Sequence, residues 1–487
     1  MPSGETATAS MIANKRTKTR EHLLLLLCGL LSLAVYWGAF AAPYNLYALS
    51  SQRATPDLGA ITGYSRLACW RYVGALVALF GLYGLGIRLT GKLQGRKALW
   101  IVLACGLAAA LLLIQVYPYA ASDVFLYIVR GRVLGVYGHN SLLVAPTAFP
   151  TETYLPFSSE WADTPSPYAP LWEWTAAGLA RLGDGSLLRS LLAFKGFGLL
   201  SYVSCISVLA AILHPHKPRE MTQGLIIFAW NPLVLLETHA MAHNDLYMVF
   251  FVLLALWFWG QKHYVWAVVC LVLGGLVKYV PLILLPPTLA LMWPRLGWRA
   301  WLRAVLAGTL VSAVLVAITL LPLWPGRVGL GVIGQMERIH NSVVAWVILL
   351  LGKFAPQNLA FDIGLWLTRV SFIVAYVIIL LSSLRRDVPL AHVYHRLLYA
   401  WLCLGAAGFG YWYIAWLIAL IPLLQLYNVR LCTVTFALCG LVSVVIYTFS
   451  RELSPQQVHL RAVPFVFGLP LLVTCIYDRW RRWRNLG

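Results

Sequence analysis

Long apolar stretches recur along most of the chain, and this feature limits its fold more than any other. A helix that crosses a membrane needs about 20 mostly apolar residues. Hydrophobic residues make up 60% of the 487 residues and charged residues only 11%. A soluble domain of this length could not cover its surface with so few charges. The sequence therefore predicts an all-α, polytopic membrane protein in which residues 1–487 form one integral membrane domain.

The apolar stretches divide into fourteen predicted spans. Because several of them are short or interrupted by proline, we expect a bundle of about 12–14 transmembrane helices with loop helices on its outer face. Two shorter apolar stretches, near 168–182 and 343–356, are interpreted as re-entrant or interfacial. The predicted spans are 22–42, 67–87, 98–116, 187–212, 222–240, 245–260, 264–278, 280–293, 304–322, 363–383, 396–409, 412–427, 431–449 and 462–477.

Lys and Arg residues fall in alternate connections between the spans, which is the pattern of cytoplasmic loops. This pattern predicts that both termini are cytoplasmic, with basic tails at 1–21 and 478–487. We expect an integral protein of a bacterial plasma membrane. The net charge of +20 would suggest a nucleic-acid partner for a soluble protein. Here the charges are spread over short loops, where anionic lipid headgroups are the expected partner, and no nucleic acid is expected.

Acidic residues have the opposite distribution, because twelve of the 17 lie in or beside the predicted outer loops. The longest outer segment, 117–186, is predicted to be the main loop of the site. Asp123 lies near its beginning, at the membrane surface after the third span. Either Asp123 or Ser122 could cap the helix that follows. Alternatively, a carboxylate at a membrane boundary that faces a cavity can act as a general base.

The same outer segment offers two candidates for contact with a substrate. Arg130 lies in the helix-like stretch that follows Asp123. Farther along, three prolines within 165–170 exclude a regular helix and fix a rigid loop around Tyr168. Aromatic side chains in such a loop either stack on sugar rings or lie in the interfacial belt of the membrane.

A second polar cluster lies between two spans, at 237–245, where polar groups facing lipid would be costly. His239 and His243 are four residues apart and could share one helical face, as zinc ligands do. No HExxH pattern accompanies them, so we predict no cofactor. A divalent metal is an alternative that the sequence does not indicate. Polar pairing, or contact with a sugar or phosphate, is favoured. The candidate binding residues are Glu237, His239, His243, Asn244 and Asp245.

Three side chains are candidates for binding a phosphate. Lys278 lies at the outer end of a span, where it either snorkels to the interface or meets a lipid phosphate. Arg338 and His340 begin another outer segment. Tyr411 and Trp412 join two later spans on the outer face, either in the interfacial belt or as an aromatic platform for a substrate.

The predicted cytoplasmic loops contain no phosphate-binding loop, no DxD pair and no dinucleotide fingerprint. An activated group would therefore reach the protein within the membrane, where a polyprenyl phosphate ester is found. A transporter or flippase of lipid-linked sugars is the main alternative. Transporters typically need ionisable groups near the bilayer midplane, whereas the polar clusters gather here at one face and favour an enzyme. A non-catalytic membrane scaffold is a third and weaker alternative.

Taken in order, the motifs of residues 117–290 resemble those of the polyprenol-phosphomannose-dependent alpha-1,6-mannosyltransferases, which belong to the GT-C superfamily of membrane glycosyltransferases. Two positions depart from the family pattern: Gly138-His139-Asn140-Ser141-Leu142 replaces Gly-x-x-Pro-Tyr, and Ala169 replaces a glycine. The matching motifs are Ser122-Asp123-Val124-Phe125-x-Tyr127, Gly131-Arg132, Pro167-Tyr168-Ala169-Pro170-Leu171-Trp172, Asn231-Pro232-Leu233-Val234, His243-Asn244-Asp245 and Lys278-x-x-Pro281.

The resemblance implies a GT-C-type bundle with an outward-facing active site. It implies that Asp123 is the catalytic base, that the donor is a polyprenyl-phosphate hexose (mannose) and that the acceptor is a lipid-linked glycan. We therefore expect inverting transfer on the non-cytoplasmic side. The phosphate that leaves would need fixed cations, for which Lys278 and Arg338 are the candidates, with His243 or His340 as hydrogen-bond donors.

Overall fold

The computed structural model describes residues 4–93, 95–158, 161–215, 218–324, 326, 339–386, 388–424 and 426–484. This part of the chain is helical. It contains no β-strand beyond two isolated bridges, one between Asn45 and Val116 and one between His340 and Gly408. The prediction of an all-α protein is confirmed.

Eight helices of the described chain are long and apolar enough to cross a membrane. Two of them, α14 and α17, bury little of their apolar surface: Leu310 is 68% exposed and Ile378 is 61% exposed. Side chains of this kind on a long helix are expected to face lipid. The long helices are α1 (Gly4–Tyr36) with η1 (Trp37–Ala41), α4 (Arg66–Thr90), α5 (Arg96–Ile114), α8 (Leu187–Leu213), α14 (Trp298–Leu320), α17 (Gln357–Arg386), α20 (Tyr427–Phe449), and the continuous α21 (Pro455–Val463), η12 (Pro464–Gly468) and α22 (Leu469–Arg484).

The other predicted spans coincide with shorter or interrupted helices, so that helical segments occupy all fourteen predicted positions. The helices in the stretches interpreted as re-entrant or interfacial are α7 (Pro170–Leu182) and α16 (Val343–Leu351). The interrupted segments are α9 (Pro218–Ala229), α10 (Pro232–Leu235) and η5 (Leu236–Ala240); α11 (Asp245–Gly260); α12 (Tyr264–Gly275); η6 (Val280–Leu284) and α13 (Leu285–Leu296); α18 (Leu390–Ala400) and η9 (Trp401–Gly405); and η10 (Tyr411–Tyr413), α19 (Ile414–Leu420) and η11 (Ile421–Leu423).

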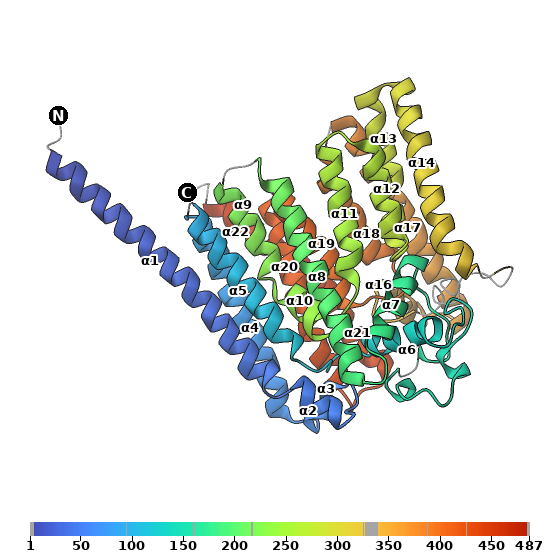
Figure 1. Ribbon diagram of the computed structural model, residues 1–487. Helices are drawn as coiled ribbons and strands as arrows, with labels where there is room; N and C mark the ends of the chain where they lie inside the picture. The colour runs from blue at the N-terminus through green and yellow to red at the C-terminus, as the bar shows by residue number, and fades with distance from the viewer. Residues whose placement is uncertain are drawn as a thin grey trace.

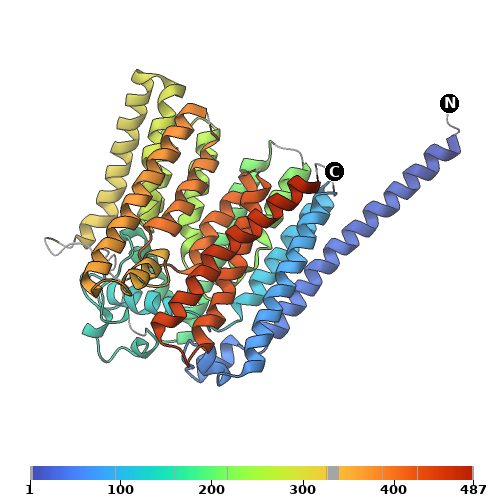
Figure 2. The same ribbon diagram turned by 180° about the vertical axis from the view of Figure 1, so that it is seen from behind.

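The two ends of the bundle differ in chemistry. Both chain termini lie at one end, the upper end in Figure 1, together with the Lys- and Arg-rich connections between helices; we call this the basic end. The short helices α2 (Leu46–Ser51), α3 (Leu58–Thr62) and α6 (Asp123–Gly135) gather with α7 at the opposite end. Figure 2 shows the same separation from behind. The main polar segment, 117–186, therefore lies away from the basic loops.

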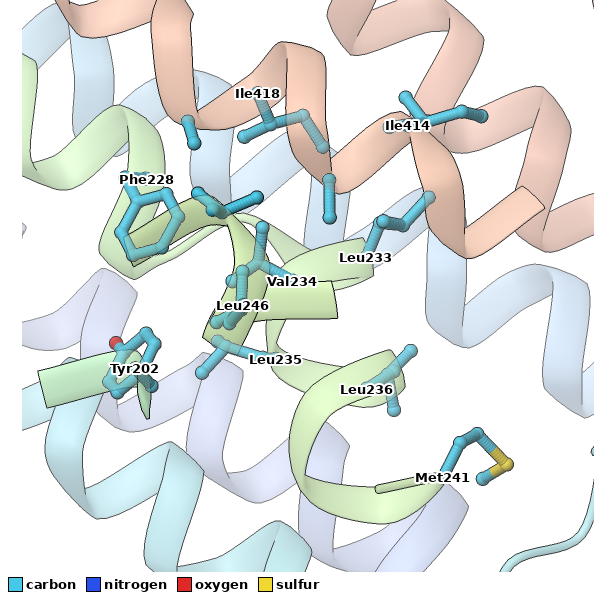
Figure 3. Close-up of a cluster of buried hydrophobic side chains, with 14 of the residues drawn as sticks. Tyr202, Phe228, Leu233, Val234, Leu235, Leu236, Met241, Leu246, Ile414 and Ile418 are labelled. Atoms are coloured by element: carbon cyan, nitrogen blue, oxygen red, sulfur yellow. The ribbon is translucent and has the colours of Figure 1, made fainter. Parts of the chain in front are cut away.

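The most buried part of the bundle surrounds the broken helix of α10 and η5. In Figure 3, Leu233, Val234, Leu235 and Leu236 lie among side chains of neighbouring helices, including Tyr202 of α8, Phe228 of α9, Leu246 of α11, and Ile414 and Ile418 of α19. Asn231 caps α10, because its Oδ1 accepts hydrogen bonds from the amides of Leu233 and Val234 at 3.0 and 3.4 Å. This packed core holds the polar residues that directly follow it.

Candidate active site

Asp123 is the first residue of α6 and lines a cavity in the described chain. The cavity has a volume of about 810 Å³, within the range of about 300–1,000 Å³ that is typical of sites for small ligands. The Asp123 side chain is 21% exposed. The preceding Ser122 makes no side-chain capping hydrogen bond to α6. The geometry therefore favours a carboxylate that faces a cavity over one that only begins a helix.

His243 lies between two carboxylates. Its Nε2 is 3.4 Å from Oδ2 of Asp123, and its Nδ1 is 3.1 Å from Oε2 of Glu237. The His243 ring also stacks on Trp412, with ring centroids 4.1 Å apart and an angle of 17° between the planes. The ring is thus held in one orientation by an aromatic face and two acids. Ala242, directly before it, has φ +61°, a left-handed conformation that turns the chain here after η5.

The pair of Asp123 and His243 has a defined protonation state near neutral pH. Burial alone would lower the pKa of His243, but the adjacent Asp123 and Glu237 outweigh it and raise the pKa to about 9. Burial would raise the pKa of Asp123, but the adjacent His243, followed by the charges of Lys278 and Arg130, holds it below its usual value. Near pH 7 the site therefore holds an ionised Asp123 beside an imidazolium.

A second ion pair lies close by. Lys278 donates from Nζ to Oδ1 of Asp245 at 2.8 Å, and Trp416 donates from Nε1 to the same oxygen at 2.6 Å. The Lys278 ammonium also lies over two aromatic rings, at 5.6 Å from the centroid of Tyr168 and 5.2 Å from that of Tyr413. Lys278 is 8% exposed. The Lys278 charge therefore interacts mainly with Asp245 and these two rings. The sequence alone did not indicate these partners.

Arg130 and Tyr168, two more predicted binding residues, do not line the cavity but hold the segments around Asp123 together. Arg130 donates from Nη2 to the carbonyls of Trp161 and Thr164, both at 3.2 Å, and so holds the proline-rich loop onto α6. The hydroxyl of Tyr168 lies 3.2 Å from the hydroxyl of Tyr127 on α6.

Asn244 and His239 differ in their distance from this cluster. The Tyr127 hydroxyl also donates to Oδ1 of Asn244 at 3.5 Å, while Asn244 Nδ2 has no partner among the described residues. His239 instead lies apart: it is fully buried, its Nδ1 bonds to the Leu235 carbonyl at 3.0 Å, and its ring packs edge-on against Tyr202. The proposed sharing of one helical face by His239 and His243 does not occur, because the turn at Ala242 separates them.

The predicted residues of the later outer segments do reach the cavity. His340, Tyr411 and Trp412 all line it. The bridge between His340 and Gly408 fixes this segment beside the aromatic one, and the buried hydroxyl of Tyr411 has no hydrogen-bond partner within the described chain. Arg338 lies outside the described residues.

Lys195 is a functional candidate that the sequence analysis missed. It is fully buried on α8, and its Nζ donates to the carbonyls of Val116 at 2.8 Å, His239 at 2.7 Å and Ala240 at 2.5 Å. These three bonds join Val116, just before the segment 117–186 that carries Asp123, to the end of η5, just before His243. A lysine inside the predicted span 187–212 was the available signal, since charges within spans are costly.

No group of three or more His, Cys, Asp and Glu side chains with the geometry of a metal site occurs among the residues that the structure describes. The prediction that the protein uses no cofactor stays a prediction. The site thus offers a ligand a proton acceptor (Asp123), an imidazolium (His243) and an aromatic surface (Trp412).

The fold and the site together define a polytopic membrane protein with a carboxylate-lined cavity at the end opposite its basic loops. The sequence profile of the family described as "Alpha-(1->6)-mannopyranosyltransferase, N-terminal domain" matches residues 26–295, more than half of the chain. The chain belongs to this family of alpha-mannosyltransferases, which confirms the resemblance found in its motifs. No curated protein matches the chain. The match includes Asp123, Glu237, His243 and Lys278 and ends before the segments of His340 and Trp412.

Proposed function

We propose that this protein transfers mannose from a polyprenyl-phosphate donor to a lipid-linked glycan on the non-cytoplasmic side of the membrane, with inversion at the anomeric carbon. The observation that carries the proposal is the position of Asp123, an ionised and partly exposed carboxylate in a cavity of about 810 Å³. Membership of an alpha-mannosyltransferase family supports mannose as the transferred sugar. It gives no support to a transporter of lipid-linked sugars.

In the proposed reaction Asp123 accepts the proton of the acceptor hydroxyl as the hydroxyl oxygen attacks the anomeric carbon of the donor. A new glycosidic bond forms, the bond between the anomeric carbon and the phosphate oxygen breaks, and polyprenyl phosphate leaves with the electron pair. His243 keeps Asp123 ionised before the reaction, and Glu237 holds the opposite nitrogen of the ring. The ring face of Trp412 keeps the imidazole in place.

The contacts of Lys278 change its proposed role. Its ion pair with Asp245 offsets its charge, so contact with a donor phosphate would require that pair to open. We propose that Lys278 instead positions Asp245 and Asn244 beside Asp123. The proposed contacts for the phosphate are His340 and Arg338. His340 lines the cavity, and Arg338 lies two residues before it in the sequence.

The location and orientation in the membrane are part of the same proposal. The basic end is proposed to face the cytoplasm of a bacterial cell, because Lys and Arg determine orientation in this way. The cavity would then open on the outer side, where the donor arrives through the membrane rather than as a soluble nucleotide sugar. The acceptor would be a glycan carried by a lipid in the same membrane.

Purified protein in detergent tests the proposal directly. It is incubated with a glycan acceptor and either polyprenyl-phosphate mannose, polyprenyl-phosphate glucose or a nucleotide-activated mannose, and the product is analysed by mass spectrometry and NMR. We expect product from the polyprenyl-phosphate mannose, with an inverted anomeric centre. Transfer from the nucleotide sugar alone, or retention of configuration, would overturn the proposal.

A further inference from the structure

The cavity that Asp123 lines is formed by several segments of the chain. One of them carries His340, whose ring lies against Trp161 with centroids 5.7 Å apart. The loop before α3 and the helices α20 and α21 form another part of the wall, to which they contribute Asp57, Tyr447 and His459. Gly59 of α3 lies so close to α20 that a Cβ there would meet the Thr448 methyl at 2.9 Å. We call the set of Asp57, Tyr447 and His459 the far end.

The far end combines an aromatic ring with polar side chains. Tyr447 lies one helical turn after Ser443 on α20, and both residues line the cavity. The ring of His459 meets the ring of Tyr447 edge-on, at 5.6 Å and 66°. Tyr447 is only partly buried, so some of its surface is available to a ligand.

The polar atoms of the far end suit hydroxyl groups. Because a carbonyl oxygen can only accept, the 2.7 Å bond between His459 Nδ1 and the Pro455 carbonyl places the ring proton on Nδ1. The Nε2 of a neutral His459 is then an acceptor. Asp57 uses Oδ1 to accept from the Ala60 amide at 2.6 Å, and a carboxylate has a second oxygen that can accept from a hydroxyl. Acceptors that surround an aromatic face are the chemistry expected for binding a sugar ring.

The same end does not suit a phosphate. None of the described residues that line the cavity is Lys or Arg, and the carboxylate of an aspartate such as Asp57 repels a phosphate. A donor phosphate is therefore not expected beside Asp57, which leaves the far end for the other substrate. The residues 443–466 that form most of this wall lie outside the family match at 26–295.

We propose that the far end is a subsite for the second sugar ring of the acceptor glycan, so that an acceptor with two or more sugars binds more tightly than a single sugar. This rests on the proposed function, because it assumes that the acceptor hydroxyl reacts at Asp123. In that arrangement the terminal sugar lies beside Asp123 and Trp412, and the next ring lies on Tyr447. Asp57 and His459 then accept hydrogen bonds from its hydroxyls.

Steady-state kinetics with a monosaccharide and a disaccharide acceptor test the subsite. Wild-type enzyme should show the lower KM for the disaccharide. Tyr447→Ala should raise the disaccharide KM about tenfold, the equivalent of about 1.4 kcal/mol, and His459→Phe should raise it by a smaller factor while keeping a ring in place. The KM for the donor should change less than twofold in both variants.

Tyr427→Ala is the matched control. Tyr427 lies on the same helix at the basic end, where it stacks on Tyr477, so this variant should keep the wild-type KM for both acceptors. A rise in the donor KM of Tyr447→Ala, or equal KM values for the two acceptors in the wild type, would overturn the subsite. Wild-type enzyme that makes no product with either acceptor would instead contradict the proposed function.

Discussion

At the scale of single residues, the protonation of His243 decides the state of Asp123. The imidazole lies 3.4 Å from the Asp123 carboxylate and 3.1 Å from that of Glu237. Its charge keeps the pKa of Asp123 below the usual value even though burial acts in the opposite direction. The proposed base is therefore ionised at every physiological pH, and its partner is charged below pH 9.

The pH dependence of turnover should report this pair. Activity of the wild type should show an alkaline limb near pH 9, where His243 loses its proton and its charge no longer acts on Asp123. In His243→Gln the alkaline limb should disappear, and the acid limb should move to higher pH because the pKa of Asp123 rises without the neighbouring cation. His392→Gln, at the basic end, is the control. An alkaline limb that persists in His243→Gln would assign it to another group.

The sequence predicted the central carboxylate and its histidine, because polar residues between apolar spans need a wet environment or a partner. It could not assign partners. The Lys278 bond to Asp245 joins residues 33 positions apart, and no local pattern reveals such a contact. His239 and His243 looked equivalent in spacing, yet only His243 reaches Asp123, because the left-handed turn at Ala242 depends on packing around α10 and η5.

At the scale of elements, the position of Asp123 depends on how closely α6 packs on α7. Gly131 and Gly135 of α6 face the backbone of α7, where a Cβ at Gly135 would lie 2.5 Å from the Ala177 carbonyl oxygen. A Cβ at Gly131 would similarly clash with the Ala176 carbonyl. Two buried hydrogen bonds fix the loop around the start of α7, since Ser141 and Ser166 donate to Glu173 at 2.5 and 2.6 Å.

Gly131→Ala should therefore push α6 away from α7 and displace Asp123. We expect a loss of about 1–3 kcal/mol in stability, the usual cost of overpacking, and a lower kcat. Thermal unfolding and turnover of the purified variant in detergent measure both effects. Gly178→Ala on α7 is the matched control, because a Cβ there has open space. Wild-type stability and turnover in Gly131→Ala would show that the close contact is not needed.

Hydropathy predicted where the helices lie but not where they break. The stretch predicted as one span at 222–240 is α9, a break at Asn231, α10 and η5. A single proline after an asparagine indicates a helix start, but the wider turn of η5 has no comparable local signal. The short helices α2 and α3 were not predicted either, because they lie in a connection between spans and are too short for a periodic pattern.

At the scale of the whole molecule, the basic connections and the cavity lie at opposite ends of the bundle. An alternating distribution of Lys and Arg along the sequence was enough to predict this separation. The shape of the cavity was not predictable, because its wall combines segments from Thr55 to Val466. Which residues meet across it depends on the packing of the complete bundle.

Labelling of introduced cysteines in intact cells should reveal the orientation. Asp163→Cys, exposed in the segment 117–186, should react with a membrane-impermeant thiol reagent added outside the cells. Lys92→Cys, exposed at the basic end, should react only after the membrane is made permeable. The wild type, with its nine native cysteines, gives the background. The reverse pattern would place the cavity in the cytoplasm and contradict the proposed delivery of the donor.

The turnover of Asp123→Asn tests the central claim most directly. An amide keeps the shape of the side chain but cannot take the proton of the acceptor hydroxyl, and general-base help is worth about 100- to 10,000-fold. With polyprenyl-phosphate mannose as donor, we predict a fall in kcat of that size in a variant that elutes and unfolds like the wild type. Near-normal kcat in a folded Asp123→Asn protein would remove Asp123 from the role of base and contradict the account.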